Sequence, residues 1–140
     1  MLCPRLKEGD QFRSTYTNLS YKVRHHLTCK SRYVVYLITC RRCGAQYIGK
    51  TTQHMHIRHG GHRSEVENES SELGEHFVAC GGVENMEIQI IDCVKEGEEE
   101  ALTVCEGYWQ NKLATLTAHG DNINIRNEWN NFVGHQPIFF

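Results

Sequence analysis

The chain has 140 residues, of which 39% are hydrophobic, and a formal net charge of −2, as expected for one globular domain. No apolar run approaches the roughly 18 residues of a membrane-spanning helix, and the chain starts without the apolar segment of a secretory signal. We therefore expect an intracellular, soluble protein, in which seven cysteines favour metal binding over disulfides.

The charge is unevenly distributed along the chain. Residues 1–63 contain twelve Lys and Arg against two acids, whereas residues 64–140 contain three against fifteen. A basic half suits a partner with a phosphate backbone. The alternative, that the two halves fold together and neutralise each other, stays open from the sequence.

The first predicted elements are a hairpin that follows a basic segment. Residues 1–31 are polar and irregular, and we expect them to form an N-terminal arm or linker. Residues 33–39 are β-branched and aromatic and are apolar on both alternations, as in a strand covered on both faces. A turn over residues 40–44 and a returning strand over residues 45–49 complete the hairpin.

The rest of the chain predicts three helices and one more strand. Thr51 or Thr52 can cap a first helix that runs to about residue 67. A second helix, a strand and a third helix are predicted over residues 69–79, 86–91 and 98–116. The order β-β-α-α-β-α favours a small α/β sandwich.

Four residues have the spacing of a zinc site. Cys40 and Cys43 place two thiolates on one tight turn, which suits a tetrahedral ion. His76 and Cys80 are four apart on a predicted helix, so they share one face and supply the second pair. Four protein ligands leave no open position, and the zinc would be structural. Cys29 is a possible substitute ligand, and the alternative is a set of buried, reduced cysteines beside an incidental histidine.

Glu106 occupies an unexpected position on the last predicted helix. On a helical wheel it falls inside the apolar stripe formed by Leu102, Trp109 and Leu113. An isolated buried charge is very unfavourable, so the carboxylate must be neutral, paired or bound to a metal ion. The plain alternative is a salt bridge at the margin of the core.

The first predicted helix carries a comparable feature. Arg58 and His62 are four apart and share a face with Met55 and Val66. Two cationic groups on a packing face are unfavourable unless they bind an anion. The alternative is a solvated edge of the helix.

Together these features resemble the GIY-YIG endonuclease family. The tripeptides Val34-Val35-Tyr36 and Tyr47-Ile48-Gly49 are similar to the pair that names the family, with Val-Val-Tyr in place of Gly-Ile-Tyr. Arg58 stands eleven residues after Tyr47, where the family has its arginine, and Glu106 matches the metal-binding glutamate. Asn122 resembles the asparagine that closes the motif set, although Asp121 replaces the expected leucine.

The cysteines suggest a subgroup of that family. Cysteines between the two tripeptides, with a downstream pair that contains a histidine, look like the endonuclease domain of Penelope-like retroelements. Cys80 stands where that subgroup usually has a second histidine. Because the domain follows a reverse transcriptase in such elements, the resemblance implies one piece of a longer nuclear protein that acts with a reverse transcriptase on DNA.

The resemblance also implies a fold and a mechanism. The nuclease domain would span residues 32–126, with a mainly antiparallel three-stranded sheet flanked by helices, and residues 127–140 would be a tail. Phosphodiester hydrolysis would use one Mg²⁺ or Mn²⁺ ion held by Glu106. Arg58 would bind the scissile phosphate, and Tyr36 would orient or deprotonate the attacking water. The supporting residues would be Tyr47, Lys50, His62 and Asn122.

A tyrosine is a poor base at neutral pH unless neighbouring cations lower its pKa. Lys50, Arg58 and His62 are the neighbouring cations that could have that effect. Two alternatives remain: a non-catalytic, zinc-stabilised DNA-binding or interaction module on the same fold, and a small zinc-dependent interaction domain in which the tyrosines and Glu106 are accidental.

Overall fold

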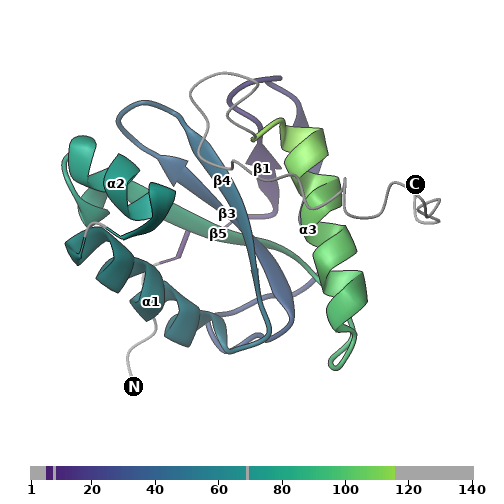
Figure 1. Cartoon of the computed structure of the whole chain (residues 1–140). Coiled ribbons are helices and arrows are strands. Elements are labelled where there is room, and N and C mark those ends of the chain that lie inside the picture. The colour runs from purple at the N-terminus through teal and green to yellow at the C-terminus, as the bar shows by residue number, and fades with distance from the viewer. Residues whose placement is uncertain (1–5, 8, 69, 116–140) are drawn as a thin grey trace.

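In the computed structural model, which describes residues 6–7, 9–68 and 70–115, helices cover both faces of a three-stranded sheet (Figure 1). Strands β3 (Val34–Cys40), β4 (Gln46–Thr51) and β5 (Met86–Cys93) lie in the order β4-β3-β5, and both pairings are antiparallel. The predicted small α/β fold with a three-stranded antiparallel sheet is therefore confirmed.

The central strand explains why its sequence is apolar on both alternations. One set of its side chains, which includes Tyr36 and Ile38, packs in the core beneath α1 (Met55–Glu67) and α2 (Ser71–Ala79). The other set, Val35 and Leu37, belongs to a second core beneath α3 (Glu99–Leu113). A 3₁₀ turn, η1 (Val83–Asn85), joins α2 to β5. Both faces of β3 are buried, as predicted.

Helix α1 begins later than its sequence predicts. Neither Thr51 nor Thr52 caps it, because β4 continues to Thr51, which pairs with Val34 of β3. The hydroxyl of Thr51 accepts a hydrogen bond from the backbone N–H of Gln53 at 3.0 Å instead. The helix starts after His54, so pairing with the central strand prevails over local capping.

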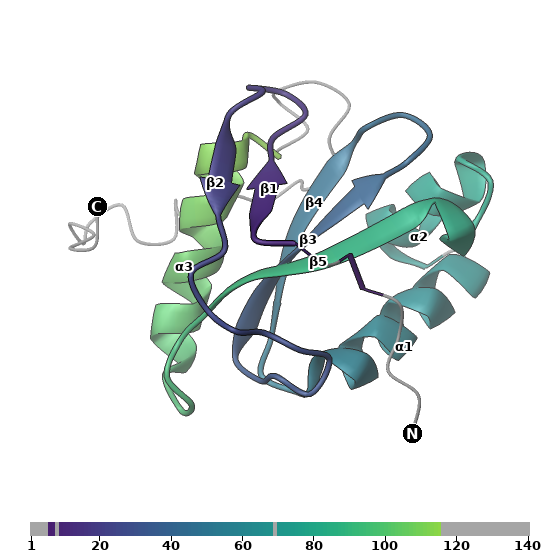
Figure 2. The same cartoon turned by 180° about the vertical axis from the view of Figure 1, so that it is seen from behind.

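The segment expected to be an arm is folded onto the domain over the part that the structure describes. Strands β1 (Gln11–Arg13) and β2 (Ser20–Lys22) form an antiparallel hairpin that lies beside α3 (Figure 2). Phe12 is 2% exposed, and its ring centroid lies 5.0 Å from that of Trp109. Ser14 Oγ donates to the carbonyl oxygen of Leu113 at 2.7 Å. The difference arises because Phe12 is buried in a core formed with the sheet and α3, which lie far along the chain and leave no local pattern in residues 1–31.

Among the helices of the described residues, none has the length and apolar character needed to cross a membrane. The predicted tail over residues 127–140 lies outside the described part of the chain.

Candidate active site and metal centre

The two tyrosine tripeptides meet where β3 pairs with β4. Tyr36 lies opposite Gly49 in the strand register, and its ring crosses the backbone of β4 at that point. A Cβ atom on Gly49 would lie 2.5 Å from Cζ of Tyr36, which is closer than real contacts allow. Glycine is therefore required at this position if the Tyr36 ring is to stay in place. The ring centroids of Tyr36 and Tyr47 are 6.5 Å apart.

Helix α1 brings two side chains to the hydroxyl of Tyr36, and a third side chain supports one of them. Arg58 Nε donates to Tyr36 Oη at 3.3 Å, and His62 Nε2 lies 2.5 Å from the same oxygen. On its other side, His62 Nδ1 donates to Glu65 Oε2 at 3.1 Å. The structure thus brings the predicted residues Arg58 and His62 together with Tyr36. Glu65 was not predicted, although its position three residues after His62 places it on the same helix face.

The direction of these hydrogen bonds follows from Glu65. Because its carboxylate accepts the Nδ1–H of His62, the Nε2 atom of the neutral imidazole is an acceptor, and the hydroxyl of Tyr36 donates to it. Burial lowers the pKa of His62, so the ring is neutral at pH 7. The hydrogen bond from His62 lowers the pKa of Glu65, which keeps its carboxylate charged. The result is a hydrogen-bonded chain from Tyr36 through His62 to Glu65, and Arg58 donates to the tyrosine oxygen at its start.

The expectation that neighbouring cations lower the tyrosine pKa is wrong for this structure. Burial, and to a lesser extent Glu106, raises the pKa of Tyr47 to about 12, with Arg58 acting in the opposite direction. Burial also raises the pKa of Tyr36, whose side chain is 0% exposed. Desolvation of the phenolate outweighs attraction to Arg58 in both cases. Both hydroxyls are therefore protonated at neutral pH.

Glu106 approaches the same region from α3, on the other face of the sheet. Its side chain is 7% exposed, and Oε1 lies 3.3 Å from Lys50 Nζ, which extends from β4. This is an ion pair of the kind that the plain alternative expects at the margin of the core. Glu106 also lies near enough to Tyr47 to raise the pKa of that hydroxyl. Edge strand β4 thus separates this carboxylate from the cluster of Tyr36, Arg58 and His62. Asn122, the remaining predicted site residue, lies outside the described residues.

Glu106 offers few oxygen ligands for a divalent ion. Mg²⁺ and Mn²⁺ prefer oxygen ligands, commonly one or two carboxylates completed by waters and substrate phosphates. Over the residues that the structure describes, Glu106 belongs to no group of three or more clustered metal ligands. An ion here would need ligands from water and phosphate, and Lys50 already neutralises the carboxylate. Binding of Mg²⁺ or Mn²⁺ therefore stays a prediction.

The second candidate site is the predicted cysteine and histidine group. Cys40 ends β3, Cys43 lies in the turn to β4, and His76 and Cys80 come from the end of α2. Their ligand atoms all lie within 4.8 Å of one another. Cys29, the suggested substitute, is not part of this group and is disulfide-bonded.

The distances within this group fit a tetrahedral ion. Bonds of the usual zinc lengths place two sulfur ligands about 3.8 Å apart and a sulfur about 3.6 Å from a nitrogen. The structure has 3.9 Å between the sulfurs of Cys80 and Cys43, and His76 Nε2 lies 3.6 Å and 3.3 Å from these two sulfurs. Burial lowers the pKa of His76, which favours the neutral form that binds metal. The four residues can hold a metal ion such as zinc.

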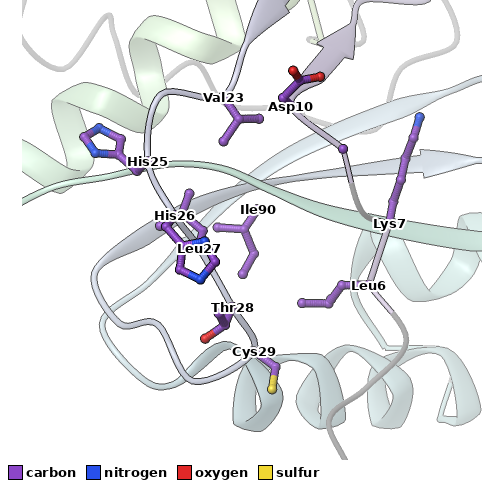
Figure 3. Close-up of a pocket in the computed structure, with 11 residues that line it drawn as sticks. Leu6, Lys7, Asp10, Val23, His25, His26, Leu27, Thr28, Cys29 and Ile90 are labelled. Atoms are coloured by element: carbon purple, nitrogen blue, oxygen red, sulfur yellow. The ribbon is translucent and has the colours of Figure 1, made fainter.

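A cavity of about 630 Å³ lies at the opposite edge of the sheet from β4. Figure 3 shows the residues that line it. Its walls come from the segment around Lys7, the loop that carries His25 and His26, and Ile90 of β5. Of the candidate site residues, it is lined only by Cys29, the suggested substitute ligand.

The chain matches no protein-family model, and searches of curated proteins and of solved structures find no match to it. The GIY-YIG resemblance therefore rests on the sequence motifs alone and stays a prediction.

Proposed function

We propose that this protein is a metal-dependent DNA endonuclease of the GIY-YIG type. The observation that carries the proposal is the meeting of Tyr36, Arg58 and His62 on one side of β4, with Lys50 and Glu106 on the other. These residues come from four separate elements. Phosphodiester hydrolysis needs three kinds of group: a cation that binds the phosphate, a proton acceptor and a carboxylate. All three lie around this one edge strand.

Arg58 is the proposed phosphate ligand. Its guanidinium contacts Tyr36 Oη through Nε at 3.3 Å and Glu65 through Nη2 at 3.5 Å. Its side chain remains 30% exposed, so an incoming phosphate can accept hydrogen bonds from the fork. Bound phosphate places the reacting phosphorus beside the tyrosine hydroxyl.

His62 is the proposed proton acceptor, through Tyr36. In the proposed step, a water that attacks the phosphorus gives its proton to Tyr36 Oη as that hydroxyl gives its own proton to His62 Nε2. Because Tyr36 and His62 are both buried, this step requires the hydroxyl to open to that water when phosphate binds. Glu65 then stabilises the imidazolium through Nδ1. This route avoids a free phenolate, which the burial of Tyr36 strongly disfavours. Tyr47 packs against His62, with ring centroids 5.9 Å apart, and helps to hold its orientation.

Lys50 and Glu106 complete the proposed site. A Mg²⁺ or Mn²⁺ ion bound at Glu106 would supply positive charge to the leaving oxygen. Lys50, whose ammonium lies 3.3 Å from Glu106 Oε1, would bind a phosphate oxygen when an ion occupies the carboxylate. The nuclear setting, the retroelement and the reverse-transcriptase partner belong to this proposal through the resemblance of the cysteine pattern.

We also propose that the ion of the cysteine and histidine group is a structural Zn²⁺. Its four ligands leave no open position for a substrate or a reactive water. The ion would join the end of β3, the following turn and the end of α2.

The second candidate function is a non-catalytic DNA-binding or interaction module on the same fold. The ion pair between Lys50 and Glu106 favours it, because a paired carboxylate has no need of a metal ion. Arg58 would then be held by Glu65 as part of the structure.

A plasmid assay separates the two functions. The protein is incubated with supercoiled DNA and Mg²⁺ or Mn²⁺, with EDTA in a parallel reaction, and nicked circles are measured. Arg58→Ala and Glu106→Ala should abolish nicking while circular dichroism and zinc content stay unchanged. Arg63→Ala, which removes an exposed arginine of the same helix, is the matched control and should keep activity. Absence of nicking by the unmodified protein with either metal, or full activity of either site variant, refutes the endonuclease.

A further inference from the structure

A second cavity, of about 490 Å³, lies between the N-terminal hairpin and α3. It is within the range of about 300–1,000 Å³ that is common for small-ligand sites. Its lining differs from that of the active-site cluster: the residues that decide its chemistry are Tyr21, Lys22, Arg24, Asp92, Tyr108 and Trp109.

Three aromatic rings form the apolar part of this cavity. The ring of Trp109 meets Tyr21 edge-on at 5.4 Å and Tyr108 edge-on at 5.0 Å between centroids. All three side chains are partly exposed. Flat, accessible aromatic rings are the usual platforms on which unpaired bases stack.

Asp92 holds the Trp109 wall in place. The indole Nε1 donates to Asp92 Oδ2 at 2.8 Å, and Cys105 Sγ lies 3.3 Å from the same oxygen. The other oxygen, Oδ1, accepts from the backbone N–H of Cys93 at 2.8 Å and lies 3.4 Å from His25 Nε2. With four such contacts the carboxylate is already engaged, so it positions the tryptophan rather than attracting a cationic ligand.

The charge around the cavity favours an anion. Lys22 ends β2 and Arg24 follows two residues later; both are exposed and both line the cavity. Aromatic rings next to two basic side chains suit a ligand that is planar at one end and negatively charged at the other. An aromatic cage for a methylated ammonium group would need the opposite charge at its rim.

We propose that this cavity binds an unpaired nucleotide of a single-stranded nucleic acid, with the base against Trp109 and Tyr108 and the phosphate at Lys22 and Arg24. The site is separate from the proposed cleavage chemistry and does not depend on it. Helix α3 serves both regions, because Glu106 faces β4 whereas Trp109 faces the hairpin.

Tryptophan fluorescence tests the proposal directly. The chain has two tryptophans, and Trp129→Phe leaves Trp109 as the single emitter. The probes are a 12-nucleotide single-stranded oligothymidylate, the same sequence in a blunt duplex, and thymidine monophosphate, all with EDTA so that no cleavage occurs. We expect saturable quenching by the single strand, with an affinity at least tenfold higher than for the duplex or the mononucleotide.

Matched variants locate the effect. Tyr108→Ala and Arg24→Glu should each weaken single-strand binding at least tenfold, whereas Tyr108→Phe should retain it because stacking does not need the hydroxyl. Arg63→Glu makes the same charge change on α1, on the other face of the sheet, and should leave the quenching unchanged. Arg24 is exposed, so its variant reports on binding even if Tyr108→Ala is unstable.

Three outcomes overturn the proposal. They are the absence of saturable quenching by the single strand, equal affinity for the mononucleotide, and quenching by tetramethylammonium in preference to nucleic acid. None of these outcomes bears on plasmid nicking, so failure of this proposal and failure of the endonuclease are distinguishable.

Discussion

Replacing Gly49 with alanine tests the contact on which the tyrosine cluster depends. The new methyl carbon would lie 2.5 Å from both Cζ and Oη of Tyr36 and 2.7 Å from Cε2. The ring cannot move aside easily, because Tyr36 is 0% exposed and is held by hydrogen bonds to Arg58 and His62. Overpacking of a rigid core typically destabilises by about 1–3 kcal/mol. For a chain of this length, 2 kcal/mol corresponds to a fall in melting temperature of about 7 °C.

Thermal unfolding followed by circular dichroism measures this effect. Gly60→Ala is the matched control, since a Cβ there meets nothing within 4 Å and lies inside α1, where alanine should stabilise by about 0.5–1 kcal/mol. In the double variant Gly49→Ala, Tyr36→Leu, the cost should be smaller than the sum of the two single costs, because the clash has been removed. If Gly49→Ala melts at the temperature of the unmodified protein, the close approach of the ring to β4 is refuted.

Four further predictions concern the metal group and the charged or titratable side chains. Cys43→Ser or exhaustive chelation should unfold the domain. The reason is that a structural zinc contributes about 10–16 kcal/mol of apparent binding energy, which exceeds the total stability of most domains. Metal analysis of the purified, folded protein should find one zinc per chain, and a folded zinc-free sample would contradict this. Glu65→Gln should lower the pKa of His62 further, because Glu65 raises it against the effect of burial; imidazole NMR titration measures the shift, and an unchanged pKa would disprove the hydrogen-bonded chain. Burial sets the pKa of His62 in the folded protein below its unfolded value of 6.5. The stability that neutral His62 contributes is therefore complete above pH 6.5 and is lost as the pH falls below 6.5. His62→Gln should accordingly flatten the pH dependence of the melting temperature below pH 6.5. Lys50→Met should destabilise the fold by about 1–3 kcal/mol, because it removes the cation beside the nearly buried carboxylate of Glu106. If Glu106 binds Mg²⁺, millimolar Mg²⁺ should raise the melting temperature of this variant. The absence of a rise would argue against metal binding at Glu106.

The parts of the structure that could be predicted are those with a local cause. The strand pair around the Cys40 turn and the helix that ends near Cys80 follow from short patterns of hydrophobicity and from turn residues. The spacing of two residues between Cys40 and Cys43, and of three between His76 and Cys80, was enough to select four ligands that the fold then brings within 4.8 Å of one another.

The tyrosine cluster could be predicted only in part. Arg58 and His62 stood out because cations are unusual on a packing face, and they do meet Tyr36. Glu65 shares their helix face, but an acid on an otherwise charged helix carries no signal of its own. The raised pKa of Tyr36 was missed because it depends on burial, which no local pattern measures.

By itself, the sequence determined the elements that follow residue 32, their order and the ligand pairs, because hydrogen bonding within strands and helices and the spacing of neighbouring ligands act over a few residues. Tertiary structure alone decided which partner each charged or aromatic group meets. Phe12 finds Trp109 from the far end of the chain, and Lys50 reaches Glu106 from another element. Such contacts depend on how elements pack over long separations in sequence, and the same packing sets the burial that controls protonation.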